Sequence, residues 1–295
     1  MPYQTLQSTT FHSLTPGPHF LVLGAIHGNE TCGPIALQRI IEGFTNGGLE
    51  LVAGTLTIFP MCNPKAHALN QRFVERNLNR ELYPKEQPQA YEDFINPIVC
   101  RVLEQADYVL DLHSFHSPGG PFIFLGGDCG EEQTFARHLG VDHFVYGWAA
   151  AYSAAHSQND KAALGTVEYA RQFGAKAATL ECGHHHNADA PDIGERAVLN
   201  GLAYLNMINR PTTPPSATQT CAKMQSVVIK EKPGQFAKPW VHFDAIKKGD
   251  AIIQYDDGTQ AVADDDCFLV LPKNDVPVGT ECVYLGVATA FPKAD

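Results

Sequence analysis

The 295-residue sequence predicts an α/β protein with a mainly parallel or mixed sheet, followed by a small all-β unit. Before residue 210, apolar strand-like runs alternate with longer helix-like segments, which is typical of an α/β layer. After residue 220, short strand-like runs separated by turns follow one another. Between these parts, Arg210 to Thr220 is rich in proline, serine and threonine and indicates a linker. We therefore expect domains at 1–210 and 221–295, joined at 211–220.

The elements of the first domain follow from hydrophobic periodicity. Five strands are expected, at Phe20–Ile26, Leu51–Phe59, Tyr108–Leu112, Phe122–Leu125 and Ala177–Leu180. Four helices are expected, at Pro34–Phe44, Tyr91–Gln105, Lys161–Phe173 and Asp192–Ile208. In the second domain, strands are expected at Ser226–Ile229, Ala251–Gln254, Cys267–Leu271 and Glu281–Gly286. In α/β sheets such as the one expected in the first domain, functional groups lie just beyond the carboxyl ends of the strands.

Charge and composition exclude several classes of partner. The formal net charge is -11, and no block rich in lysine and arginine occurs, so we expect no nucleic-acid partner. No apolar run approaches the roughly 20 residues that span a bilayer, so no membrane association is expected. The polar start, Met1 to Thr10, lacks the features of a secretory signal. The 8 cysteines are scattered without a Cys-x-x-Cys pair, and we interpret them as reduced thiols in a cytoplasmic protein.

A histidine and a glutamate follow the first strand, three residues apart. His27 and Glu30 stand where the chain turns from the strand towards the first helix, and Gly28 between them allows a close bend. Neutral imidazole and carboxylate are both good zinc ligands. The same spacing also arises by chance, as a carboxylate at a helix start beside an ordinary histidine. The motif alone therefore leaves metal binding and a structural role equally open.

Two further strands end in residues of the same kind. The run Tyr108 to Leu112 leads into His113, and Ala178 to Leu180 leads into Glu181. Taken singly, each is compatible with an ordinary polar residue at a strand end. Asp111 could face the same way as His113 and orient it as a ligand, or it could be a structural carboxylate. Three ligands would leave a zinc position open for water, and a nearby glutamate could take that water's proton.

A basic stretch follows the second strand. Three arginines and two asparagines lie within Arg72 to Arg80, after Asn63-Pro64. A guanidinium group binds a carboxylate with two parallel hydrogen bonds and can also stabilise an oxyanion. A solvated basic loop is the alternative that composition alone leaves open.

Taken together and in this order, the motifs resemble those of the aspartoacylase and succinylglutamate desuccinylase family, which is related to the zinc carboxypeptidases. The matching segments are His-Gly-Asn-Glu, Asn-Pro-x-Ala followed by Arg-Phe and Leu-Asn-Arg, Asp-Leu-His-Ser, and Leu-Glu-x-Gly. The stretch Phe268 to Glu281 also resembles the end of that family's small β domain. The resemblance implies a three-layer α/β/α, zinc-carboxypeptidase-like domain with a mixed sheet, and a β domain that flanks the cleft.

The resemblance also implies a role for individual residues. One Zn²⁺ per chain would be held by His27, Glu30 and His113, and Glu181 would be the general base and acid. Arg72 would polarise the scissile carbonyl. Further residues would bind the substrate, namely Asn79, Arg80 and Tyr284. The implied substrate is a small-molecule N-acyl amino acid such as N-acetylaspartate or N-succinylglutamate; formation of a homo-oligomer stays open.

The sequence departs from the family at two places. Asn77 stands where the family often has aspartate, which we expect to remove an acidic neighbour of the arginines. After Glu181 the chain continues with Cys182-Gly183 and then His184, His185 and His186, a segment unlike that of aspartoacylases. Because adjacent residues point in different directions, we expect no second metal at this triple histidine.

The function predicted from all of this is a zinc-dependent amidohydrolase that cleaves the amide bond of an N-acyl amino acid. Two alternatives stay open at this point. One is a zinc carboxypeptidase that acts on small peptides. The other is a non-catalytic zinc-binding regulatory protein on the same fold, although such a protein would be expected to lack Glu181.

Overall fold

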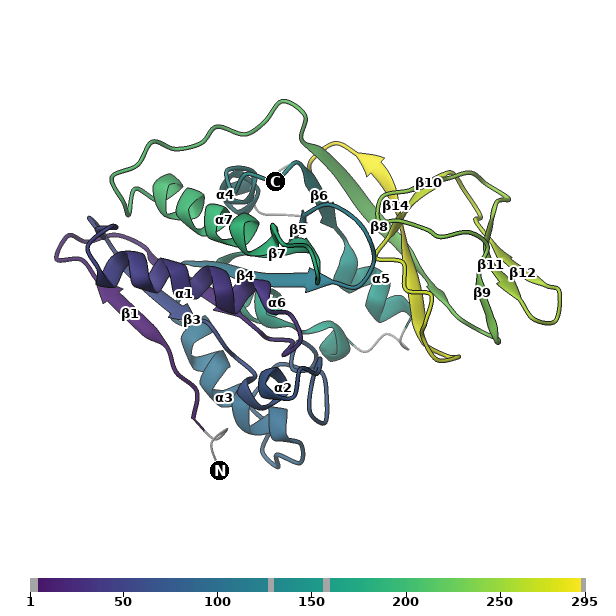
Figure 1. Ribbon diagram of the computed structural model, residues 1–295, viewed down its shortest axis with the longest axis horizontal. Coiled ribbons are helices and arrows are strands. Elements are labelled where there is room, and N and C mark those ends of the chain that lie inside the picture. Colours follow the sequence, from purple (N-terminus) through teal and green to yellow (C-terminus); the bar gives the residue numbers. More distant parts are fainter. Residues whose placement is uncertain (1–4, 127–129, 156–159, 293–295) are drawn as a thin grey trace.

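The computed structural model describes residues 5–126, 130–155 and 160–292, and an eleven-stranded mixed sheet forms its centre (Figure 1). From one edge to the other, the strands follow the order β1-β3-β2-β4-β7-β5-β6-β8-β14-β13-β10. Their bounds are β1 (Thr9–His12), β2 (His19–Gly24), β3 (Thr55–Phe59), β4 (Tyr108–Phe115), β5 (Phe122–Leu125), β6 (His143–Tyr146), β7 (Lys176–His184), β8 (Thr220–Ile229), β10 (Ala245–Ile246), β13 (Cys267–Val270) and β14 (Glu281–Thr289).

The strands in the middle of the sheet are parallel. β2 pairs in parallel with β3 and with β4, and β4 pairs in parallel with β7. The carboxyl ends of these four strands therefore meet at one edge of the sheet, where loops can bring their side chains together. β1 is antiparallel to β3, and β5 is antiparallel to β7, so the sheet is mixed. The predicted mixed α/β fold is confirmed.

Helices cover both faces of the parallel strands. Phe20 and Val22 of β2 pack in a cluster with residues of α1, α4 and α7, whereas Leu21 and Leu23 pack in a second cluster with residues of α3 and α6. Successive strand residues point to opposite faces, so a continuously apolar strand requires cover on both sides. The helices are α1 (Cys32–Thr45), α2 (Pro64–Ala68), α3 (Tyr91–Leu103), α4 (Gly130–Arg137), α5 (Trp148–Ala155), α6 (Thr166–Arg171) and α7 (Ala190–Tyr204), with a 3-10 turn at Asp160–Ala163.

The part of the chain after residue 220 forms strands, as the sequence predicts. β9 (Gly234–Phe236), β11 (Ala251–Tyr255) and β12 (Gln260–Val262) make a separate antiparallel sheet in the order β12-β11-β9. The remaining strands continue the large sheet, because β8 pairs with β6 and carries β14 on its other side (Figure 1). The division into domains at 211–220 stays a prediction, since one sheet runs through both parts.

Two predicted elements differ from the structure for identifiable reasons. The expected helix Lys161–Phe173 is a 3-10 turn and the short helix α6, separated at Gly165. A β-carbon at Gly165 would lie 2.5 Å from Asn79 Oδ1, so this position requires glycine. The expected strand Leu51–Phe59 begins only at Thr55, because Gly54 before it adopts a φ of +76° in a turn against Pro18.

Two further sequence predictions concern thiols and membranes. Cys129 lies outside the described residues, and the other seven cysteines are free thiols. Among the described residues, none of the helices is both long enough and apolar enough to cross a bilayer.

Candidate metal centre

The loop between β2 and α1 brings the first two predicted ligands together. Ala25, directly after β2, adopts a φ of +47°, and the backbone N–H of Glu30 donates to the carbonyl oxygen of His27 over 3.2 Å. Gly28 lies against α2, where a β-carbon would come within 2.2 Å of the Ala66 carbonyl carbon. The tight turn thus depends on glycine at position 28, and it directs the side chains of His27 and Glu30 towards the end of β4.

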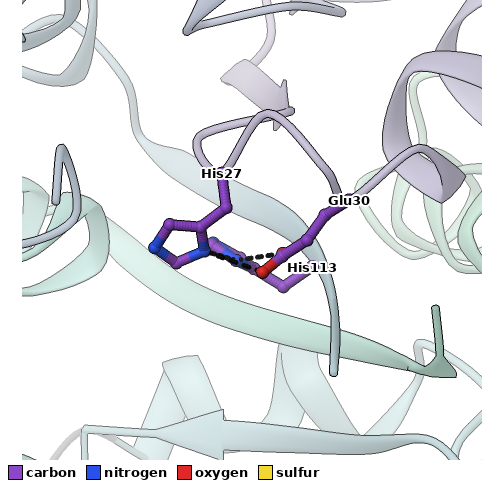
Figure 2. Close-up of side chains that lie close together, drawn as sticks. All are labelled: His27, Glu30 and His113. Carbon is purple, nitrogen blue, oxygen red and sulfur yellow. Dashed lines mark hydrogen bonds and ion pairs between the residues drawn. The ribbon is translucent and has the colours of Figure 1, made fainter. Parts of the chain in front are cut away.

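His27, Glu30 and His113 converge on one point (Figure 2). The Nδ1 atoms of the two histidines are 3.2 Å apart, and each lies 2.8 to 2.9 Å from a carboxylate oxygen of Glu30. Ligands on a tetrahedral zinc ion with bonds of about 2.0 Å are about 3.3 Å apart, so this spacing is close to that of a zinc site. All three side chains are buried. Within the described residues, they form the one group of three or more metal-ligating side chains that lie this close together.

The hydrogen-bond partners of His27 leave its Nδ1 atom available to bind a cation. Asn77 Oδ1 accepts from the backbone N–H of Asn79 over 2.9 Å and also lies 2.9 Å from His27 Nε2. That oxygen fixes the proton of neutral His27 on Nε2, and leaves a bare Nδ1 facing Glu30. Two electron-pair donors at 2.9 Å repel each other unless a cation lies between them. The donor set and its tautomers therefore fit a metal ion.

Outer hydrogen bonds hold the remaining atoms of this centre. Asp111 Oδ2 lies 2.9 Å from His113 Nε2 and accepts a hydrogen bond from the Thr166 hydroxyl over 2.5 Å. The backbone N–H of Ser114 donates to Glu30 over 3.1 Å. Metal-ligating histidines usually have such a carboxylate or carbonyl partner, which fixes the ring orientation and raises its basicity. Asp111 is thus placed to orient His113, one of the two roles that the sequence left open for it.

Burial and charge set the protonation of the two histidines differently. Burial and the charge of Arg72 lower the pKa of His27 to about 3, so its imidazole is neutral. Burial also disfavours the charged form of His113, but the carboxylates of Asp111 and Glu30 outweigh it and raise its pKa well above the usual value. Burial alone would raise the pKa of Glu30, but its contacts with both histidines keep that pKa well below the usual range.

Glu181 lies on the neighbouring strand, opposite His113 in the register of β4 and β7. Its side chain is buried, and within the described residues its Oε2 atom has no hydrogen-bond partner. Burial, with repulsion from Glu30, raises the pKa of Glu181 to about 7. A carboxyl group with a pKa near neutrality can both accept and donate a proton, which suits a general base and acid.

A buried carboxylate shapes the basic stretch. Glu92 of α3 accepts hydrogen bonds from the backbone N–H groups of residues 74, 75 and 76. Arg76 is used for structure, since it forms an ion pair with the buried Asp93. The other two arginines, Arg72 and Arg80, line a cavity of about 660 Å³ beside the candidate metal centre.

The same cavity is lined by most of the predicted site residues. They are His27, Arg72, Asn79, Arg80, His113, Glu181 and Tyr284. Arg72 donates to Glu30 over 2.9 Å, and its side chain remains about one third exposed (31%). The Arg80 guanidinium lies 4.5 Å from the ring centre of Trp148 and 4.7 Å from that of Tyr152. The roles of these residues in catalysis and substrate binding stay predictions.

The structure shows the contacts of the residues at the two family departures. The Asn77 side chain contacts His27 and the backbone of Asn79, so its replacement of aspartate changes the charge beside a candidate ligand. The described contact of Asn77 with an arginine is made by its backbone carbonyl, which accepts from Arg76, and the expected effect on the arginines stays a prediction. In the triple histidine, His185 lies 2.7 Å from the Ser114 hydroxyl through Nδ1, and His186 is exposed.

Several residues of the cavity were not predicted from the sequence, among them two aromatic residues and a lysine. Trp148 and Tyr152 hold Arg80, and Lys273 enters the cavity from the segment after β13. The two aromatic residues lie four apart on α5, which was itself not predicted. Lys273 falls within the stretch that resembles the family's β domain, but a single lysine in a turn carries no functional signal of its own.

Known proteins of one family are similar to this chain. The sequence model of the succinylglutamate desuccinylase/aspartoacylase catalytic domain matches residues 16–205. A succinylglutamate desuccinylase of Erwinia tasmaniensis is 35% identical over 102 residues, which are 34% of this chain and 29% of that protein. A probable aspartoacylase of Nostoc sp. is 32% identical over 114 residues, which are 36% of this chain and 38% of that protein. The aligned parts thus span well under half of either relative.

A solved structure extends the likeness to the whole fold. The structure of a succinylglutamate desuccinylase/aspartoacylase from Rhodobacter sphaeroides superposes with a TM-score of 0.77 at 16% identity. The superposition covers 96% of this chain and 90% of that chain. The likeness therefore includes the C-terminal strands that follow residues 16–205.

Proposed function

The chain belongs to the succinylglutamate desuccinylase/aspartoacylase family, and we propose that it is a zinc-dependent amidohydrolase that cleaves the amide bond of a small N-acyl amino acid. The observation that carries this proposal is the position of Glu181. It is a buried carboxyl group with one oxygen that has no hydrogen-bond partner among the described residues, and it lies beside His113 in a cavity that Arg72 and Arg80 also line.

The residues divide the chemistry among them. A zinc ion at His27, Glu30 and His113 would supply Lewis-acid polarisation and lower the pKa of water. Glu181 accepts the proton of the attacking water and then donates it to the departing nitrogen. A pKa near 7 allows both transfers at neutral pH. Arg72, which lines the cavity and is about one third exposed, donates to the carbonyl oxygen as negative charge develops there.

Arg80 and Asn79 bind the carboxylate of the amino acid in this proposal. Stacking on Trp148 and Tyr152 limits the motion of the Arg80 guanidinium, and its Nη1 atom also donates to the Asn79 carbonyl oxygen over 2.6 Å. Asn79 Oδ1 accepts from the backbone N–H of Thr166 at the start of α6, which holds the amide in place. A preorganised group loses little entropy on binding, so it contributes more to affinity than a mobile one.

The proposal is tested by replacing the base while keeping the metal. Glu181→Gln is nearly isosteric, and we expect it to lower kcat for N-acyl amino acids by about 100- to 10,000-fold with zinc content unchanged. Glu50→Gln is the matched control, because Glu50 is an exposed glutamate far from the cavity in sequence and should leave kcat unchanged. Two results together would contradict the proposed enzyme: zinc-loaded wild-type protein binds N-acyl amino acids without turnover, and Glu181→Gln binds them equally well. The protein would then be a non-catalytic binding protein.

A further inference from the structure

Glu92 is a buried carboxylate that ties together segments on two sides of the candidate metal centre. It lies in the first turn of α3 and is fully buried. Its Oε1 atom accepts from the Asn63 side-chain amide over 3.1 Å and from the backbone N–H of Val74 over 2.7 Å. Its Oε2 atom accepts from the backbone N–H groups of Glu75 and Arg76, each over 3.2 Å. The four donors are uncharged amides.

Amide N–H groups alone compensate the charge of Glu92 among the described residues. The nearby cations Arg76 and Lys85 pair with Asp93 instead. Consecutive backbone N–H groups that point at one anion form a favourable anion site. A buried carboxylate that lost these donors would be left without compensation, which is costly. The charge of Glu92 therefore fixes the backbone of residues 74–76.

The fixed segment 74–76 lies between two residues of the candidate site. Arg72, two residues before it, lines the cavity and donates to Glu30 over 2.9 Å. Asn77 directly follows it, and the Oδ1 atom of Asn77 lies 2.9 Å from His27 Nε2. Because so little chain separates each of these residues from the fixed segment, a shift of that segment would move both of them.

The fourth donor connects the same carboxylate to the turn after β2. The backbone N–H of Asn63 donates to the Ala25 carbonyl oxygen over 3.0 Å, and its Oδ1 atom caps α2 by accepting from the Ala66 N–H over 3.3 Å. Gly28 packs against this helix, and its N–H donates to the Arg72 carbonyl oxygen over 3.1 Å. The buried carboxylate thus holds the turn after β2 and the loop with Arg72 in a fixed relation to each other.

We propose that Glu92 is a positioning residue of this site, which acts through Arg72 on the reaction and through Asn77 on metal binding. The part that concerns Arg72 rests on the proposed amidohydrolase function, whereas the part that concerns Asn77 requires only the metal centre. Glu92 is not among the residues that line the cavity, and it takes no part in the proton transfers.

The first experiment replaces the carboxylate by an amide of the same shape. Glu92→Gln exchanges one acceptor oxygen for an NH₂ group, so at least two of the four N–H donors lose their acceptor. We expect kcat for N-acyl amino acids at saturating zinc to fall by about 10- to 100-fold, the effect of displacing a catalytic group by about 1 Å. In an Arg72→Ala background, the same substitution should lower kcat by less than about threefold, because the group through which it acts is absent. An equal factor in both backgrounds would refute the action through Arg72.

The second experiment measures zinc affinity by chelator competition and needs no turnover. Loss of an orienting partner weakens zinc binding by about 10- to 100-fold, and we expect its displacement in Glu92→Gln to weaken binding by about 3- to 10-fold. In an Asn77→Ala background, Glu92→Gln should have no further effect. Equal weakening in both backgrounds, or none in either, would refute the action through Asn77. If wild type hydrolyses no N-acyl amino acid, the proposed function fails, and this experiment still decides the role of Glu92.

Ile95→Val is the matched control for a loss of stability in α3. Ile95 is buried on the same helix, and the substitution removes one methyl group without touching the carboxylate, so kcat and zinc affinity should stay unchanged. If circular dichroism shows that Glu92→Gln does not fold, Glu92→Asp, which keeps the charge but has a shorter reach, takes its place in both experiments. Failure of both variants to fold would show that Glu92 serves stability and would overturn the proposal.

Discussion

Replacing Asp111 by asparagine removes a negative charge behind the candidate metal centre with almost no change in shape. Asp111 is fully buried, and its Oδ2 atom contacts His113 Nε2 at 2.9 Å and the Thr166 hydroxyl at 2.5 Å. An asparagine oxygen at the Oδ2 position can still accept from both His113 Nε2 and the Thr166 hydroxyl, and the amide nitrogen replaces Oδ1, which has no hydrogen-bond partner among the described residues. The variant should therefore fold, and it should differ from wild type mainly by the lost negative charge of Asp111.

The effect on zinc affinity follows from the role of the carboxylate. Removing the partner of a metal-ligating histidine weakens binding by about 10- to 100-fold, which is about 1.4 to 2.8 kcal/mol. A second effect acts through protons. The raised pKa of His113 means that this group must lose a proton when zinc binds, so wild-type affinity rises with pH until that pKa is passed. Without Asp111 this pKa falls, and the rise of affinity with pH becomes shallower.

Competition against a chromogenic chelator measures the zinc affinity as a function of pH. The comparison is cleanest at the highest pH at which the protein is folded, where proton competition at His113 is weakest. Thr166→Val is the control, because it removes the hydroxyl from Asp111 but keeps the charge. A folded Asp111→Asn variant with the zinc affinity and pH dependence of wild type would refute the placement of the metal on His113.

Three further predictions follow from the same contacts. Asn77→Asp places a carboxylate against His27 Nε2, so zinc affinity measured by chelator competition should increase, by up to about tenfold; a decrease would contradict this orienting contact. Arg72→Ala should lower kcat by about 100- to 1,000-fold, whereas Arg80→Ala should act mainly on KM; steady-state kinetics with equal kcat/KM for Arg72→Ala and wild type would remove Arg72 from the mechanism. Because the pKa of Glu181 is raised to about 7, the folded metal-free protein keeps a proton that the unfolded chain releases, and its stability falls as pH rises from about 4.5 to 7. Glu181→Gln should abolish this fall and raise the free energy of unfolding at pH 8 by on the order of 1 to 3 kcal/mol, as measured by denaturant unfolding; equal pH profiles of the two proteins would show that Glu181 is not buried as described.

The sequence predicts the centre of the fold well because the relevant signals are local. The apolar runs that become β2, β4 and β7 are each followed directly by the polar residues that meet at the sheet edge. Parallel pairing then brings those residues together without any further information. The joint order of the motifs added what no single motif contained, namely which histidines and glutamates belong to one site.

Features that depend on distant packing were not predicted. The break at Gly165 reflects a hydrogen bond between Thr166 and Asn79, which are far apart in the sequence, and helical periodicity contains no sign of it. The pairing of β8 with β6 across the expected linker is also non-local. Lys273 reaches the cavity only through the C-terminal strands, so its place beside the site becomes visible only in the folded chain.

The most direct test of the central claim is the release of free amine from a panel of N-acetyl and N-succinyl amino acids, measured with metal-stripped and zinc-restored protein side by side. The panel should include dipeptides, since a peptidase would cleave these instead. We expect no turnover without metal, and turnover of at least one N-acyl amino acid after about one equivalent of zinc is restored. Turnover that is equally fast in the stripped protein, or zinc-loaded protein that releases no amine from any N-acyl amino acid, would contradict the account.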